Sequence, residues 1–129
     1  MVCLFCDIPP DRVIASNELA YAIRDGFPVT SLHSLVIPKS HKIDYFSLSR
    51  DELLACDQLL RSLKEQIQSA DSEVTGFNIG LNAGESAGQT VFHCHFHLIP
   101  RRNGDVDNPS GGVRHVIPGK GHYGPSAAK

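Results

Sequence analysis

The strongest pattern along the chain is a helical one between residues 50 and 70. Apolar residues recur there at spacings of three and four, with polar residues between them, and this spacing places the apolar side chains on one face of a helix. The apolar positions are Leu53, Cys56, Leu60, Leu63, Ile67 and Ala70. Ser49 followed by Glu52 matches a capping box, in which each side chain bonds the other residue's backbone N–H. We therefore expect one main helix over about 50–70 whose opposite face is solvated.

Shorter runs of alternating apolar and polar residues predict strands. Two of them, separated by the turn-like segment 16–18, suggest a hairpin. The expected strands cover about 12–15, 19–25, 32–38, 75–81 and 90–102, with a further short candidate at 113–117. No repeat or linker divides the chain. The order of elements predicts a single α+β domain over 1–129, with an antiparallel sheet of about five strands, a core over about 3–102 and a turn-rich tail over 103–129.

The segment 90–102, TVFHCHFHLIPRR, has three histidines at alternate positions: His93, His95 and His97. Because side chains alternate between the two faces of a strand, this spacing predicts three imidazoles on one face. The opposite, buried face would hold Phe92, Cys94, Phe96 and Leu98. Burying three imidazoles without partners is costly, which indicates a functional site. The three could share a catalytic metal, if the strand bends or their side chains converge, or one could act as a nucleophile.

A loop of small residues precedes the histidines. Gly84, Ala87 and Gly88 are expected to leave backbone amides accessible, and Gln89 and Thr90 add polar side chains. A plain connection between strands has the same composition. Beside three histidines, however, the loop is better interpreted as a cradle that binds an oxyanion or phosphate group of a substrate.

The composition narrows the classes of partner. The 129 residues include 12 basic and 14 acidic side chains, for a net charge of −2, so the chain offers no general electrostatic attraction for nucleic acid. No apolar run is long enough to cross a bilayer, and the first residues, MVCLFCD, lack the features of a signal peptide. We therefore expect a cytoplasmic protein that binds neither nucleic acid nor membrane.

Two of the four cysteines, Cys3 and Cys6, form a C-x-x-C pair. In a cytoplasmic chain this spacing is more typical of a metal or redox motif than of a disulfide. A redox pair normally begins a helix after a strand, whereas two prolines follow here, which favours half of a zinc site. Cys56 and Cys94 fall on apolar faces and are expected in the core.

Three separated segments together resemble the histidine triad (HIT) family. They are CLFCDI, SLHSLVIPKSH and GLNAGESAGQTVFHCHFHLIPR, and the last contains the family's alternation of His with apolar residues. The resemblance covers about residues 3–102 and implies a HIT-like fold and a homodimer. The tail after residue 102 resembles that of a bacterial group described as diadenosine tetraphosphate hydrolase-like.

The resemblance implies roles for the residues that match family positions. His95 matches the nucleophile, which attacks the α-phosphate of a nucleotide and forms a nucleotidyl-histidine intermediate. The other positions are His97 and Asn82, which contact the phosphate; Thr90, whose hydroxyl bonds the phosphate or leaving group; Asp25, which accepts hydrogen bonds from the ribose; and His33, beside the site.

The resemblance also implies a full set of zinc ligands. Family members with the amino-terminal C-x-x-C carry a zinc site whose other ligands match His41 and His93, which gives Cys3, Cys6, His41 and His93. Four protein ligands leave no open position, so this zinc would be structural. This interpretation separates His93 from catalysis.

Two features depart from the family pattern or extend it. Ser31 and Leu32 replace the usual Pro-Gly before the third strand, which leaves the nucleobase preference open, although a purine nucleoside phosphate is expected. Arg101, Arg102 and Arg114 could reach distal phosphates of a polyphosphate or could be surface charges on turns.

The leading hypothesis is a nucleotide hydrolase or transferase that cleaves at the α-phosphate of nucleoside 5′-phosphate conjugates. Dinucleoside polyphosphates and nucleoside phosphoramidates are the substrate classes to test. The alternatives are a nucleotide-binding regulatory module with little catalysis, a dinucleoside polyphosphate phosphorylase, and a metal-dependent hydrolase that uses all three histidines.

Overall fold

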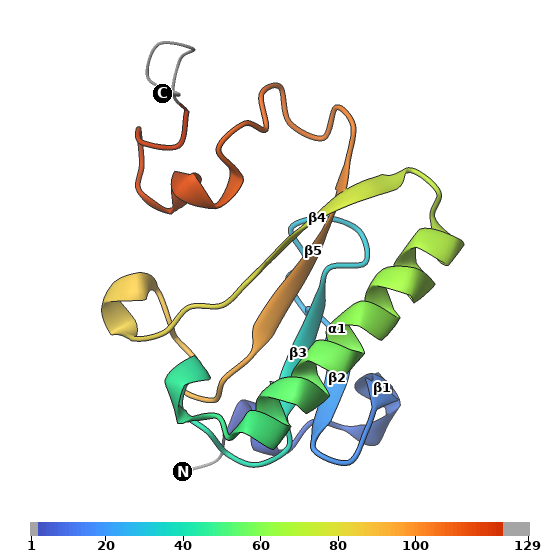
Figure 1. Ribbon diagram of the computed structural model, residues 1–129, viewed down its shortest axis with the longest axis vertical. Coiled ribbons are helices and arrows are strands. Elements are labelled where there is room, and N and C mark those ends of the chain that lie inside the picture. Colours follow the sequence, from blue (N-terminus) through green and yellow to red (C-terminus); the bar gives the residue numbers. More distant parts are fainter. Residues whose placement is uncertain (1–2, 123–129) are drawn as a thin grey trace.

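The computed structural model describes residues 3–122. One antiparallel sheet of five strands has the order β1-β2-β3-β5-β4, and a single long helix, α1, lies across one of its faces (Figure 1). The elements are β1 (Val13–Ser16), β2 (Ala20–Arg24), β3 (Ser34–Pro38), α1 (Arg50–Ala70), β4 (Val74–Gly80) and β5 (Phe96–Arg102). The predicted α+β class and five-stranded sheet are confirmed. Within the described residues, no helix is long and apolar enough to cross a membrane.

Helix α1 begins with the predicted capping box. The Ser49 hydroxyl accepts from the Glu52 N–H at 3.1 Å, and the Glu52 carboxylate accepts from the Ser49 N–H at 2.8 Å. The buried apolar positions are Cys56, Leu59, Leu63 and Ile67. Leu59 is therefore buried where Leu60 was predicted to be; Leu60 is half-buried, and the predicted Ala70 is exposed at the end of the helix. Both leucines border the apolar stripe, and the orientation of the helix on the sheet decides which one is covered.

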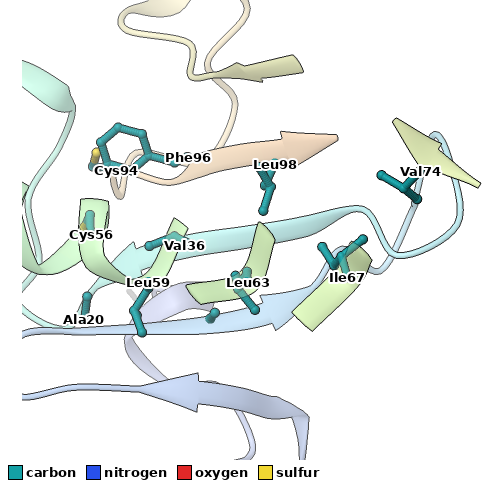
Figure 2. Close-up of a cluster of buried hydrophobic side chains, with 11 residues drawn as sticks. Ala20, Val36, Cys56, Leu59, Leu63, Ile67, Val74, Cys94, Phe96 and Leu98 are labelled. Carbon is teal, nitrogen blue, oxygen red and sulfur yellow. The ribbon is translucent and has the colours of Figure 1, made fainter. Parts of the chain in front are cut away.

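The main core fills the space between α1 and the sheet. Figure 2 shows Leu63 and Ile67 of the helix facing Val36 and Leu98 of the central strands. Cys56 and Cys94 belong to the same cluster, as predicted, and burial raises the pKa of these thiols to about 12 and about 11. Both thiols are therefore protonated at neutral pH and pack as small apolar groups.

The opposite face of the sheet is covered by the amino-terminal segment. Alternate residues of β2 and β3 point to this side, and they form a second cluster with Phe5. The cluster comprises Phe5, Tyr21, Ile23, Leu35 and Ile37. The two faces of the sheet therefore differ. Helix α1 closes one face, whereas the other face has room for a site beside the amino-terminal segment.

The histidine segment is not one continuous strand. Strand β5 begins at Phe96, and His93 and His95 lie in an irregular stretch before it. The Cys94 N–H donates to the Lys42 carbonyl at 2.6 Å instead of joining the sheet ladder, so the chain leaves the sheet here. The predicted continuous strand is therefore wrong before Phe96, and Phe92 is 46% exposed instead of buried. The alternation itself persists, because Cys94, Phe96 and Leu98 belong to the cluster under α1, whereas the rings of His93 and His95 both contact Phe5 on the opposite side.

The tail also differs from its prediction. A short 3-10 helix, η5 (Gly112–Val116), replaces the strand expected at 113–117. The Arg114 N–H donates to the Gly111 carbonyl at 2.8 Å, and Gly111 has a φ of 89°, which favours glycine. In Figure 1 the segment after β5 loops away from α1. Residues 123–129 of the predicted tail lie outside the described residues.

Candidate active site

A cavity of about 410 Å³ lies against the sheet face opposite α1. Its polar lining includes Asp25 at the end of β2, Asn82 after β4, and Thr90 in the loop before the histidine segment. The imidazoles of His95 and His97 line the same cavity. The fold thus brings five of the predicted site residues together around one cavity, although they are spread over more than seventy positions of the chain.

His95 is held in one orientation by its own backbone. Its Nδ1 lies 2.8 Å from the His93 carbonyl oxygen, which can only accept, so Nδ1 carries the proton. The edge of the Phe5 ring packs against the imidazole, with ring centroids 4.9 Å apart. In the neutral ring, Nε2 is therefore the nitrogen with the free lone pair, the atom that a nucleophilic histidine uses.

His97 is oriented by a chain of two hydrogen bonds. The Val29 N–H donates to Nδ1 of His33 at 3.1 Å, so the proton of neutral His33 resides on Nε2. That nitrogen lies 2.9 Å from Nδ1 of His97 and 3.4 Å from an Asp25 carboxylate oxygen. Because His33 donates to Nδ1 of His97, the proton of neutral His97 is on Nε2. His97 therefore presents an N–H donor where His95 presents a lone pair.

Burial keeps this pair of histidines neutral. The pKa of His97 is lowered to about 4, chiefly by desolvation and also by the neighbouring His95 and His33, while Asp25 opposes the shift. Desolvation also lowers the pKa of His33, again opposed by Asp25. His33 is 2% exposed and stands behind His97, so it positions His97 and does not line the cavity.

The loop before the histidines differs from the predicted amide cradle. The N–H groups of Ala87, Gly88 and Gln89 donate to carbonyls of the loop itself, at 2.9–3.1 Å. The Gly84 N–H donates to the Gln89 side chain at 2.8 Å. These four amides are therefore unavailable to a phosphate, and the donors that the predicted residues place at the cavity are the side chains of Asn82, Thr90 and His97.

Gln89 is buried and lies outside the cavity lining. Its Oε1 accepts from Gly84, and its Nε2 donates to the carbonyls of Ile43 and Val91, at 2.6 and 3.1 Å. The side chain thus fastens the loop to the segment after β3. The structure thus places Gln89 where it holds the loop beside Thr90 and not among the residues that line the cavity.

A separate cluster unites the four residues expected to bind zinc. The ligand atoms of Cys3, Cys6, His41 and His93 all lie within 4.8 Å of one another. Nδ1 of His93 is 3.3 Å from the Cys3 sulfur and 3.5 Å from the Cys6 sulfur, and the Cys6 sulfur is 3.3 Å from Nδ1 of His41. Tetrahedral zinc, with bonds of about 2.3 Å to sulfur and about 2.0 Å to nitrogen, places such atoms roughly 3.5 Å apart.

The surroundings of this cluster also suit a metal. His93 is fully buried, and its Nε2 donates to the Pro38 carbonyl at 2.8 Å, which leaves Nδ1 unprotonated and free to ligate. Two thiols and two imidazoles are a typical donor set for structural zinc. Within residues 3–122, no group of potential ligands joins His93 to His95 and His97, so the hypothesis of one metal held by all three histidines is wrong.

The three arginines suggested for distal phosphates do not line the cavity. Arg101 binds Asp105 through two hydrogen bonds of 2.8 Å, and Arg102 binds Asp71 at 2.9 Å. Arg114 donates to backbone carbonyls near the end of the tail. These contacts favour the alternative interpretation, in which the arginines stabilise turns at the surface.

Sequence reasoning missed Arg12, Leu4 and Phe27, which line the cavity beside Asp25. Leu4 and Phe27 lie in irregular segments that carry no periodic signal. The observed pairing of Val13 with Ile23 brings Arg12 close to Asp25, whereas the predicted turn over 16–18 would pair Val13 with Tyr21, so the sequence carried no signal for Arg12.

Comparisons with known proteins agree with this arrangement. The family model described as HIT domain matches residues 8–104. An uncharacterised HIT-like protein of Mycoplasma genitalium is 39% identical over 103 residues, which cover 77% of this chain and 72% of the relative.

Two crystal structures are similar in fold as well as in sequence. A hypothetical histidine triad nucleotide-binding protein from Sulfolobus tokodaii has a TM-score of 0.73 and 34% identity, over 82% of this chain and 73% of that one. A zinc-bound histidine triad family protein from Mycobacterium smegmatis has a TM-score of 0.72 and 35% identity, over 80% of this chain and 77% of that one.

Proposed function

Since the chain belongs to the HIT domain family, we propose that it is a nucleotide hydrolase or transferase that cleaves at the α-phosphate of nucleoside 5′-phosphate conjugates. The observation that supports this most directly is the bond from Nδ1 of His95 to the His93 carbonyl. It leaves Nε2 as the nucleophilic atom in a cavity that also holds a carboxylate and several hydrogen-bond donors.

In the first step, Nε2 of His95 attacks the α-phosphorus, and the bond from phosphorus to the leaving group breaks. The imidazole gains positive charge, which the His93 carbonyl stabilises through the proton on Nδ1. A polyphosphate leaves as an anion, whereas the amine of a phosphoramidate takes up a proton from solvent. In the second step, water attacks phosphorus, the bond from phosphorus to Nε2 of His95 breaks, and its electron pair returns to the ring. The attacking water gives a proton to solvent, so the products are a nucleoside monophosphate and neutral His95.

Neutral hydrogen-bond donors would stabilise the negative charge on the phosphoryl oxygens. The neutral donors at the cavity are the N–H at Nε2 of His97, the Asn82 amide and the Thr90 hydroxyl. A neutral imidazole donates without adding a full charge to a buried site. Oδ1 of Asp25 accepts from the Phe27 N–H at 2.8 Å, and Oδ2 lies 3.4 Å from Nε2 of His33. The carboxylate has further lone pairs that could accept from the ribose hydroxyls.

A substrate panel with an acid-quench experiment tests this function. Diadenosine polyphosphates and nucleoside phosphoramidates would be incubated with the wild-type protein, His95→Gly and the remote control His122→Ala. We expect release of a nucleoside monophosphate and a trapped nucleotidyl adduct with the wild type and the control only. An active His95→Gly variant would exclude His95 as the nucleophile, and binding without turnover in the wild type would favour the regulatory module. Phosphorolysis with inorganic phosphate as acceptor would identify a phosphorylase.

We propose further that Cys3, Cys6, His41 and His93 hold a structural zinc. The metal would tie the amino-terminal segment to the loop after β3 and to the histidine segment, three parts of the chain that otherwise share few regular hydrogen bonds. A reducing compartment such as the cytoplasm, which we propose as the site of action, keeps both thiols available for the metal.

We also propose a homodimer. Strand β4 forms one edge of the sheet, and Ile79 on it is 54% exposed. An apolar groove lies between this strand and α1, lined by Leu60 and Phe77 among others. An edge strand with exposed apolar side chains tends to be covered by another chain.

A further inference from the structure

Arg12 has a fixed backbone at the wall of the cavity. It ends a 3-10 turn, η2 (Pro10–Arg12), in which its N–H donates to the Pro9 carbonyl at 3.0 Å. The next residue, Val13, pairs with Ile23, and a bulge follows between Val13 and Ala15. Bulges redirect neighbouring side chains, and here the guanidinium extends along β2 toward the cavity.

Among residues 3–122, the guanidinium of Arg12 is held at one nitrogen. Nη2 donates to the Arg24 carbonyl at 3.0 Å, and it lies beside Gly26, where an added Cβ would be 3.8 Å away. The arginine ion pairs found among residues 3–122 involve Arg61, Arg101 and Arg102 and not Arg12. An arginine at a cavity wall, anchored by a carbonyl and without a carboxylate partner, has donors left for a ligand's acceptors.

The position of Arg12 relative to the other lining residues indicates which part of a bound nucleotide it contacts. This step rests on the function proposed above. His95 and His97 adjoin one another, with ring centroids 5.4 Å apart, and Asp25 lies 4.0 Å from Nδ1 of His97. A phosphorus at His95 with ribose hydroxyls at Asp25 leaves the base beyond Asp25. The base is attached next to the ribose 2′-hydroxyl, on the side where Gly26 and Arg12 lie.

We infer that Arg12 selects the nucleobase and that it favours purines with a 6-oxo group, guanine and hypoxanthine, over adenine. The planar guanidinium can donate two parallel hydrogen bonds to O6 and N7 of a 6-oxopurine. Adenine presents an amino group in place of O6, so one guanidinium N–H would face another donor. Pyrimidines have no N7 and therefore lack the O6 and N7 pair on this edge.

Binding of nucleoside monophosphates tests this inference without requiring turnover. Titration calorimetry would measure GMP, IMP, 7-deaza-GMP, AMP and CMP with the wild type, Arg12→Ala, Arg12→Lys and the control Arg61→Ala, which removes the same charge from an exposed site on α1. We expect GMP and IMP to bind about tenfold more tightly than AMP to the wild type and the control, and 7-deaza-GMP to lose most of this advantage. Both Arg12 variants should bind GMP and AMP equally, because lysine keeps the charge but lacks the two-pronged donor.

Three results would overturn the inference. One is equal affinity of the wild type for GMP and AMP, and another is an unchanged preference in Arg12→Ala. The third is an equal loss of affinity for all five nucleotides in Arg12→Ala, which would indicate general charge attraction or stacking. In each case nucleotide binding itself would stand, whereas failure of the wild type to bind any nucleotide would overturn the proposed function as well.

Discussion

The buried His97 makes the stability of the protein depend on pH in a calculable way. Its pKa is about 4 in the folded protein, against an ordinary value of 6.5. The unfolded chain therefore binds a proton at a higher pH than the folded one. Such a group costs no stability above about pH 6.5, where it is neutral in both states, and it destabilises the folded protein increasingly as the pH falls from 6.5 toward 4.

The size of the effect follows from the two pKa values. At about pH 7.5 both states are almost unprotonated at this residue, and the cost of keeping His97 neutral is below about 0.1 kcal/mol. At about pH 5.5 the unfolded state is mostly protonated, and the folded state loses about 1.4 kcal/mol relative to it. The His97 side chain is 25% exposed, so solvent screens this contribution only in part.

Urea denaturation at the two pH values, with zinc at a constant concentration, measures this loss. The comparison is with His97→Asn, because the asparagine side-chain oxygen can still accept from His33 but does not titrate. We expect the wild type to lose about 1.4 kcal/mol more than the variant between about pH 7.5 and about pH 5.5. Equal losses in the two proteins, or a titration of His97 by NMR near its ordinary pKa, would refute the reasoning.

Three further predictions concern the metal, the oligomer and the loop. Chelation should remove about one zinc per chain, measured by mass spectrometry, and lower the melting temperature, and His93→Ala should do the same; an unchanged melting temperature after metal loss would exclude a structural zinc. Ile79→Lys should convert a dimer into a monomer in light scattering, whereas Leu54→Lys on the exposed part of α1 should not. Gln89→Ala should cost about 2 kcal/mol in urea denaturation, because it leaves buried backbone groups without partners; a cost below about 0.5 kcal/mol would show that water replaces the side chain.

The regular elements were predictable because their signals are local. The capping box at Ser49 and the apolar spacing after it determine α1 within the chain itself. The alternating faces of β2 and β3 follow from side-chain direction in a strand, which also needs no distant partner.

The differences arise where distant contacts decide the local structure. The Cys94 N–H pairs with the Lys42 carbonyl and His93 turns toward Cys3, so β5 starts later than the alternation suggests. The N–H groups of the loop before the histidines donate to carbonyls of the same loop, in turns that its glycines allow. The composition of the loop does not reveal which of its amides are bonded in this way. Arg12 joined the site only through the register of β1 with β2.

His93 belongs to two sites at once. The ring of His93 is in the cluster proposed to hold zinc, while its carbonyl oxygen orients the imidazole of His95, the proposed nucleophile. Asp25 and Arg12, in contrast, stand on the β1–β2 hairpin, outside that cluster. Partial metal depletion should therefore lower kcat more than it raises KM, so the turnover number of a preparation would report its metal content.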